Sequence, residues 1–188
     1  MGATVARLGR EIEVKLADGR ALVVRDAHKR DARGITSMLD AVAAEPQATL
    51  VLRPGEAAPA DWRRRIVDSL RAPRGLFLVA DSGGTIVGNL GLWPDGNPAS
   101  AHVAWIGMSV ADGFRGAGAG GSLLETAVRW AESAGFRRVV LGVFPENVRA
   151  MGFYERHGFV REGLRREQYR RGDRYHDEVL MARPLTGR

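Results

Sequence analysis

Apolar residues recur along the chain with two different periods, and these periods predict its strands and helices. Alternation of apolar and charged residues over residues 12–16 predicts a strand. The pair Asp18-Gly19 that follows predicts a type I′ hairpin turn into a second strand. From Asp31 onward the apolar positions recur every three or four residues, which predicts one buried face of a helix.

The remainder of the chain continues with the same two periods, interrupted by glycine- and proline-rich turns. Residues 47–60 read as a loop with a short extended piece at Thr49–Leu52. After it we expect a helix around 62–70, strands at 76–80, 85–92 and 103–110, a helix around 123–131, a strand at 139–144, a short helix between Asn147 and Gly158, and strands at 159–168 and 175–181. The order β-β-α-α-β-β-β-α-β-α-β-β indicates an α/β fold in which helices cover both faces of a mixed sheet.

Length and composition favour one domain and exclude several classes of protein. The chain has 188 residues, 45% of them hydrophobic, which is enough for one sizeable core. It contains no cysteine, so a disulfide scaffold, thiolate catalysis and cysteine-bound metal are excluded. It also has no apolar run of transmembrane length and no signal-like N-terminus, so we expect a cytoplasmic protein that does not contact a membrane.

The formal net charge is +6, and almost all of the positive charge is arginine, with lysine only at Lys15 and Lys29. Arginine binds phosphate through two parallel hydrogen bonds, so an anionic partner is one interpretation. A GC-rich genome would produce the same bias without a functional meaning. The basic residues are scattered rather than gathered into a long tract, so we do not expect nucleic acid as a partner.

The most informative segment is residues 113–121, where five of nine residues are glycine between a strand and a helix. Glycines let the backbone approach a ligand, and the N-terminus of a helix offers unpaired N–H groups and a positive dipole end. This combination predicts a site for a phosphate or pyrophosphate, with Arg115 adding a cation at its edge. A dinucleotide fingerprint is a weaker fit because five residues separate Val110 from Gly116, and no lysine is present for a nucleotide P-loop.

Four stretches of the sequence resemble the GNAT family of N-acetyltransferases. The run Arg115-x-x-Gly118-x-Gly120 is similar to the acyl-CoA loop of that family. The run from Asn147 to Phe159 is similar to its N-x-x-A-x-x-x-Y-x-x-x-G-F stretch. Residues 25–32 and 172–181 resemble the opening and the ending of bacterial members.

The resemblance implies a single-domain fold with a mixed, mostly antiparallel central sheet flanked by helices. It spans the segment 20–183 as an N-acetyltransferase domain, with 1–19 as an N-terminal extension and hairpin strand and 184–188 as a tail. One departure concerns Ala117, Ala119 and Gly121, which stand where many members carry a lysine, a bulky apolar residue and an arginine. This weakens one phosphate contact and leaves the backbone site intact.

The resemblance also implies acetyl-CoA as cosubstrate, no metal, and a set of site residues. A bulged strand would expose backbone N–H and C=O groups beside the thioester, and Tyr154 would protonate the departing CoA thiolate. The implied cofactor-binding residues are Met108, Ser109, Val110, Arg115, Gly116, Ala117, Gly118, Ala119, Gly120, Gly121, Ser122, Asn147 and Tyr154. Without the resemblance, Tyr154 reads as a core tyrosine and Asn147 as a helix cap.

The sequence offers several candidates for the general base. His102 leads into a central strand, and an imidazole with a pKa of about 6.5 suits the task. Glu45 and a water relayed to a backbone carbonyl are alternatives. His28, His157 and His176 are further candidates on surface loops.

The acceptor and the partners are the last expectations. Segment 37–75 holds no excess of carboxylates over arginines, which disfavours a polyamine and favours a primary amine on a neutral or anionic small molecule, such as an amino acid or an analogue. A protein N-terminus is the alternative acceptor, and a non-catalytic CoA-binding regulatory module is the alternative function. An edge strand or an exposed Trp93 would support a homodimer.

Overall fold

The protein is described from a computed structural model, which covers residues 7–46 and 49–185. Eight strands form one open sheet in the order β1-β2-β3-β4-β5-β6-β8-β7. The strands are β1 (Ile12–Lys15), β2 (Ala21–Asp26), β3 (Leu76–Ser82), β4 (Thr85–Pro94), β5 (Val103–Val110), β6 (Arg138–Val143), β7 (Val160–Arg171) and β8 (Arg174–Pro184). The helices are α1 (Ala32–Ala43), α2 (Pro59–Arg71), α3 (Ala119–Ser133) and α4 (Val148–Arg156). Of the paired strands, β5 and β6 run parallel and the others run antiparallel.

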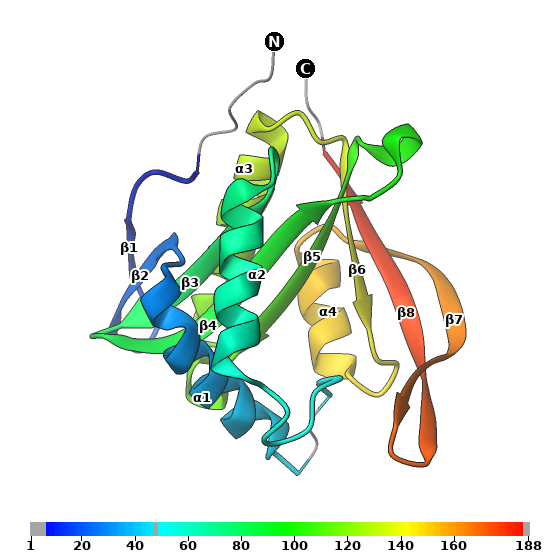
Figure 1. Cartoon of the computed structure of the whole chain (residues 1–188), viewed down its shortest axis with the longest axis horizontal. Helices are drawn as coiled ribbons and strands as arrows, with labels where there is room; N and C mark the ends of the chain where they lie inside the picture. The colour runs from blue at the N-terminus through cyan, green and yellow to red at the C-terminus, as the bar shows by residue number, and fades with distance from the viewer. Residues whose placement is uncertain (1–6, 47–48, 186–188) are drawn as a thin grey trace.

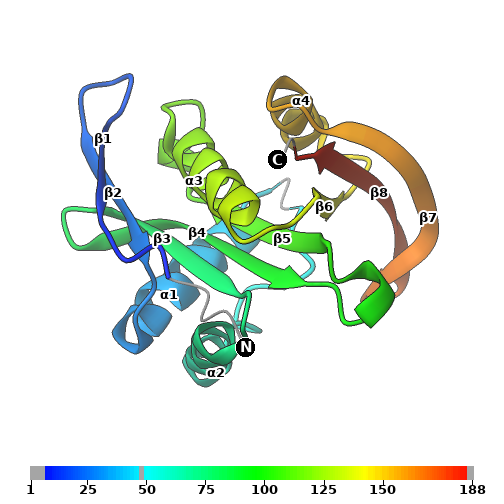
Figure 2. The same cartoon turned by 90° about the horizontal axis from the view of Figure 1, so that it is seen from above.

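The helices divide between the two faces of the sheet, as Figures 1 and 2 show. Helices α1 and α2 lie on one face, where Ile35, Leu39 and Ile66 pack against Phe77 and Val79 of β3. Helices α3 and α4 lie on the other face and bury a larger apolar cluster. The predicted fold class and the predicted order of twelve helices and strands are both confirmed.

Two local predictions are wrong, and burial explains both. The predicted type I′ turn is instead a five-residue loop over residues 16–20, because Lys15 pairs with Ala21. Type I′ needs two positive φ angles, and Gly19 has one of 87° while Asp18 does not. Leu16 is only 3% exposed, so the chain must bury this side chain before it turns.

The second wrong prediction is the extended piece at Thr49–Leu52, which forms no strand. Leu50 and Leu52 instead pack against the core between the sheet and helices α1 and α2. Their apolar side chains therefore serve packing and not strand pairing. The first six residues of the predicted N-terminal extension and residues 186–188 of the predicted tail lie outside the described residues. No helix of the described residues is long and apolar enough to cross a membrane.

A buried arginine joins the start of α1 to the sheet. The guanidinium of Arg25 on β2 donates to both carboxylate oxygens of Asp31 at 2.7 and 3.0 Å, and to Asp81 on β3 at 2.8 Å. The Arg25 and Asp31 side chains are 9% and 7% exposed. Burial works against ionised Asp31, but the hydrogen bonds from Arg25 and from the His28 N–H outweigh it and hold the pKa of Asp31 below its usual value.

We expect Arg25→Met to lower the free energy of unfolding by about 3–5 kcal/mol, because it leaves two carboxylates unpaired beside the core. Arg64→Met is the matched control. It removes an exposed pair with Asp61, whose side chains are 72% and 49% exposed, and should cost about 0–1 kcal/mol. Urea denaturation at pH 7 measures both values. Since the pKa of Asp31 is lowered on folding, its contribution is present above pH ~4 and is lost as the pH falls below that value. A cost for Arg25→Met no larger than that for Arg64→Met would contradict the structural role of this cluster.

Candidate functional site

The sheet opens between its two central parallel strands. β5 and β6 pair only at Val103–Arg138, Ala104–Val139 and Trp105–Val140. Beyond these three pairs β5 continues with β4 as far as Val110, while β6 continues with β8 as far as Val143. Residues 106–110 of β5 therefore have a neighbour on one side only, and the side toward β6 is left without strand partners.

The direction of the backbone groups shows which of these residues face the gap. The N–H of Ala111 donates to the carbonyl of Val87 in β4 at 2.9 Å. Since backbone direction alternates along a strand, Ser109 also turns its polar groups toward β4, while Met108 and Val110 turn theirs toward β6. The expected bulge in this strand is wrong, because the register between β4 and β5 is unbroken. Divergence of β6 exposes the backbone instead.

The glycine-rich segment lies at the end of this gap and leads into α3. Gly118 is the N-cap of α3 with a φ of 112°, and Gly116 has a φ of 78°. Within residues 7–46 and 49–185, no backbone carbonyl accepts from the N–H groups of residues 116–121. Six neighbouring donors at the N-terminus of a 15-residue helix form a site suited to an anion.

The turn between β1 and β2 holds this loop in place from the side. Ala17 N–H donates to the carbonyl of Ala117 at 3.0 Å. Arg20 donates to the carbonyl of Gly113 at 2.6 Å and lies 3.8 Å from the centre of the Phe114 ring. The shape of the loop is therefore fixed by contacts from the β1–β2 turn. The local sequence patterns did not predict this brace, by which we mean the contacts of Ala17 and Arg20 with the loop.

Arg115 is engaged within the protein. Its guanidinium donates to both oxygens of Glu45, just after α1, at 2.6 and 2.8 Å, and its Nε donates to the carbonyl of Val110 at 2.7 Å. Glu45 is thereby occupied as well. With the Val110 carbonyl already bonded, the backbone groups left facing the gap beside the loop are those of Met108 and the N–H of Val110.

Tyr154 of α4 lies on the α3 side of the sheet. It is 7% exposed and packs between Phe153 and Phe159, with ring centres 5.3 and 5.5 Å away. Burial raises the pKa of Tyr154 to about 12, because the phenolate would lose its hydration. Its hydroxyl has no hydrogen-bond partner among the described residues, so it stays protonated and available to a ligand.

Asn147 does two things at the start of α4. Its side-chain oxygen accepts from the Ala150 N–H at 3.0 Å, which caps the helix. Its amide nitrogen donates to the Thr49 hydroxyl at 2.6 Å, in the loop between α1 and α2. The cap interpretation is confirmed, and the contact to Thr49 ties α4 to the opposite helix layer.

Comparison with known proteins identifies this arrangement. The model of the acetyltransferase (GNAT) family matches residues 38–159. The chain belongs to this family. Among relatives, the L-amino acid N-acetyltransferase AaaT of Escherichia coli is 27% identical over 164 residues, which is 86% of this chain and 97% of that protein. The N-alpha-acetyltransferase RimI of Mycobacterium tuberculosis is 34% identical over 129 residues, covering 68% and 76% of the two chains.

A solved structure shares the fold of this GNAT chain. It is a phosphinothricin acetyltransferase from Sinorhizobium meliloti in complex with AcCoA, with a TM-score of 0.75 and 21% identity, covering 92% of this chain and 89% of that one. The resemblance to an N-acetyltransferase is thus confirmed at the level of the family and the fold. The interpretation as an enzyme is confirmed by the same family membership.

The structure does not bring His102 to the other predicted residues of this acetyltransferase. His102 is exposed before β5, six residues ahead of Met108, a span of roughly 20 Å along an extended strand. His28 lies at the start of α1, and the Nδ1 of His157 contacts the Phe153 carbonyl at 2.8 Å. His176 packs on Phe144. In the part of the chain that the structure describes, no three His, Asp or Glu residues are grouped to hold a metal ion.

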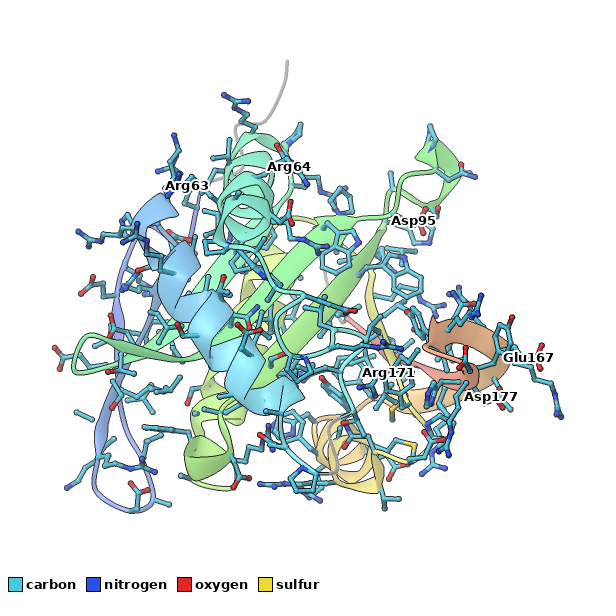
Figure 3. The ribbon with its side chains drawn as sticks, turned by 60° about the horizontal axis from the view of Figure 1, so that its bottom comes forward. Arg63, Arg64, Asp95, Glu167, Arg171 and Asp177 are labelled. Atoms are coloured by element: carbon cyan, nitrogen blue, oxygen red, sulfur yellow. The ribbon has the colours of Figure 1, made fainter. Side chains whose placement is uncertain are left out.

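On the sheet face opposite α3 and α4, no helix of the described residues covers the part beside the gap, and we call this part the open face. On that face β5 and β6 present Gly107 and Gly142, both exposed, and β8 presents Glu178. In β7, residues 166–168 oppose the single residue Asp177 of β8, and the Glu167 N–H donates to Asp177 at 2.8 Å. Figure 3 shows these two residues together on the outer side of the curved hairpin, with Arg171 on the side nearer α1 and α2.

Proposed function

We propose that this GNAT protein transfers the acetyl group of acetyl-CoA to the primary amine of a small molecule with an anionic group, such as an amino acid or an analogue. The observation that carries the proposal is the gap between β5 and β6, which presents the unpaired backbone of Met108 beside six free N–H donors at residues 116–121. A structural relative bound to AcCoA supports the choice of cosubstrate.

In this proposal the pyrophosphate of acetyl-CoA binds the N–H groups of residues 116–121 and the positive end of α3. The Ser122 hydroxyl donates to the Gly118 carbonyl at 3.1 Å and so supports the first turn of the helix. Arg115 contributes by fixing the Val110 carbonyl and Glu45 rather than by direct contact with phosphate. Asn147, at the start of α4, stays a predicted contact to the cofactor.

The acetyl group then lies in the gap, where the Met108 N–H can donate to the thioester oxygen. Negative charge develops on that oxygen as the amine attacks, and a fixed donor in a dry site stabilises it. Tyr154 donates its proton to the sulfur as the C–S bond breaks. A phenol with a pKa of about 12 is a weak acid, but the same apolar surroundings also raise the pKa of the thiol that forms.

Charge near the open face supports an acceptor with an anionic group. The guanidinium of Arg53, in the loop after α1, lies against Gly172 at the tip of the β7–β8 hairpin, and Arg170 donates to the Gly172 carbonyl at 2.9 Å. The AaaT relative, named for L-amino acids, aligns over nearly its full length. A protein N-terminus is the second candidate acceptor, favoured by the 34% identity to RimI.

The first prediction of the proposed function concerns the glycine loop. Gly118→Ala should weaken acetyl-CoA binding by roughly tenfold or more, equivalent to about 1.4 kcal/mol, because a Cβ disfavours the positive φ that aims the N–H groups. Gly84→Ala is the matched control, since Gly84 also has a positive φ, of 88°, but lies in the β3–β4 turn. Isothermal calorimetry gives both dissociation constants, and equal affinities for the two variants would exclude the loop as the binding site.

The second prediction concerns Tyr154. Tyr154→Phe keeps the packed ring and removes the proton donor, so kcat should fall roughly 10²–10⁴-fold while acetyl-CoA affinity stays unchanged. Tyr175→Phe serves as control because Tyr175 is 58% exposed on β8. Thiol release under saturating substrates measures kcat. If Tyr154→Phe keeps the wild-type kcat while chemistry limits turnover, Tyr154 is a packing residue only.

The third prediction tests the acceptor class. We expect kcat/KM to be higher for at least one amino acid or analogue than for spermidine or for peptides with free N-termini, because Arg53 and Arg170 lie near the open face and can bind the anionic group of an amino acid. The measurement is thiol release across such a panel. A preference for peptides would move the assignment to a protein N-terminal acetyltransferase, and a tenfold preference for spermidine would contradict both.

A further inference from the structure

Glu178 of β8 is a buried carboxylate on the open face of the sheet. The residue is 5% exposed and is flanked by two partners from β7. The Tyr169 hydroxyl donates to its Oε1 at 2.8 Å, and Arg165 donates to its Oε2 at 3.2 Å. Burial, followed by this hydrogen bond, raises the pKa of Tyr169 to about 12, so the phenol remains a donor to the carboxylate.

The carboxylate lies directly over the backbone of β6. A Cβ at Gly142 would collide with the Oε1, Cδ and Cγ atoms of Glu178, so the absence of a side chain at position 142 is what gives the carboxylate its place. No other residue type fits there without moving Glu178. Gly142 thus leaves room for the carboxylate, which is buried over β6 rather than a charge on the surface.

Strand register places this carboxylate at the level of the gap. Trp105 is the last residue of β5 that pairs with β6, where it meets Val140. Two residues further along each strand are Gly107 of β5 and Gly142 of β6, which no longer pair, and Met108 follows Gly107. Glu178, over Gly142, therefore lies at the β6 edge of the gap, and the stretch of β5 that contains Met108 forms the opposite edge.

Glu178 and Tyr154 lie on opposite sides of the sheet. Gly142 pairs with Leu180, so Glu178, two residues away, shares the face of Gly142, while Tyr154 belongs to the cluster under α3 and α4. An amine must reach the carbonyl carbon of the thioester from the side that the donor does not fill. The face with Glu178 is that side.

We propose that Glu178 binds the amino group of the acceptor at the gap and accepts the proton that this group loses. The proposal rests on the proposed acetyl transfer. The amine nitrogen forms a bond to the thioester carbon, the C–S bond breaks, the sulfur takes the Tyr154 proton, and the amine proton passes to Glu178. Return of that proton to Tyr154 through solvent restores both residues, and the products are the acetylated amine and CoA.

The surroundings of Glu178 allow this role. Each carboxylate oxygen can accept two hydrogen bonds, and one site on each is occupied, so the carboxylate retains acceptor capacity for an amine. The Arg165 side chain is 42% exposed and also lies 5.5 Å from the Trp105 ring centre. Its guanidinium can therefore turn to an anionic group on the acceptor. Arg165, Tyr169 and His176 are titratable groups of β7 and β8 that share this face, and the pair Arg171 and Arg174 follows on the same face toward the hairpin tip.

The test compares Glu178→Gln with Glu162→Gln, a second carboxylate on the same hairpin, which is paired with Arg138. We expect Glu178→Gln to lower kcat/KM for the best amine roughly 10²–10⁴-fold, with acetyl-CoA affinity in calorimetry unchanged, and Glu162→Gln to match wild type. Glu178→Ala should regain rate on addition of formate, because a small carboxylate can enter the vacated space. A purely structural residue would not respond to formate.

The outcomes separate the two proposals. A wild-type chain that acetylates amines together with a Glu178→Gln rate equal to it overturns the role of Glu178 and leaves the transferase function standing. Loss in Glu178→Ala that formate does not reduce also overturns it. A wild-type chain that acetylates no amine overturns both. Should Glu178→Gln fail to fold, the double variant Glu178→Gln with Arg165→Gln, which leaves no unpaired charge, is compared with Arg165→Gln alone, and an equal kcat/KM of the two overturns the role of Glu178.

Discussion

The short pairing between β5 and β6 is the constraint on which the rest of the molecule depends. Three residue pairs hold two sheet halves together, one built on β4 and the other on β8. A backbone without a strand partner is costly when it is buried, so the gap needs either water or a ligand with its own donors and acceptors. The helix layers, the glycine loop and the curved hairpin are all arranged around the residues that this divergence uncovers.

Two arginines anchor α1 across this arrangement. Arg25 holds Asp31 at its start, and Arg115 holds Glu45 just beyond its end. The first contact is to the sheet and the second is to the glycine loop, so one helix links the face where an acceptor would arrive to the segment proposed for the coenzyme. The Asn147 contact to Thr49 adds a third connection between the two faces.

The sequence predicts the element order because apolar periods are local, and it predicts the glycine loop because backbone freedom is a property of glycine itself. The wrong predictions depend on tertiary contacts. Burial of Leu16 lengthens the first turn, and divergence of β6 replaces the expected bulge at residues 108–110. The partners of Arg115, and the position of Glu178 over Gly142, follow from strand register between distant segments, which no local pattern encodes.

The brace between the β1–β2 turn and the glycine loop has a consequence for the order of assembly. Arg20 and Gly113 are 93 positions apart, so their hydrogen bond closes a long loop of the chain. The entropy of that closure is spent during folding, before any ligand arrives. A ligand of this loop therefore recognises only the fully folded chain, and by mass action it draws the folding equilibrium toward the native state.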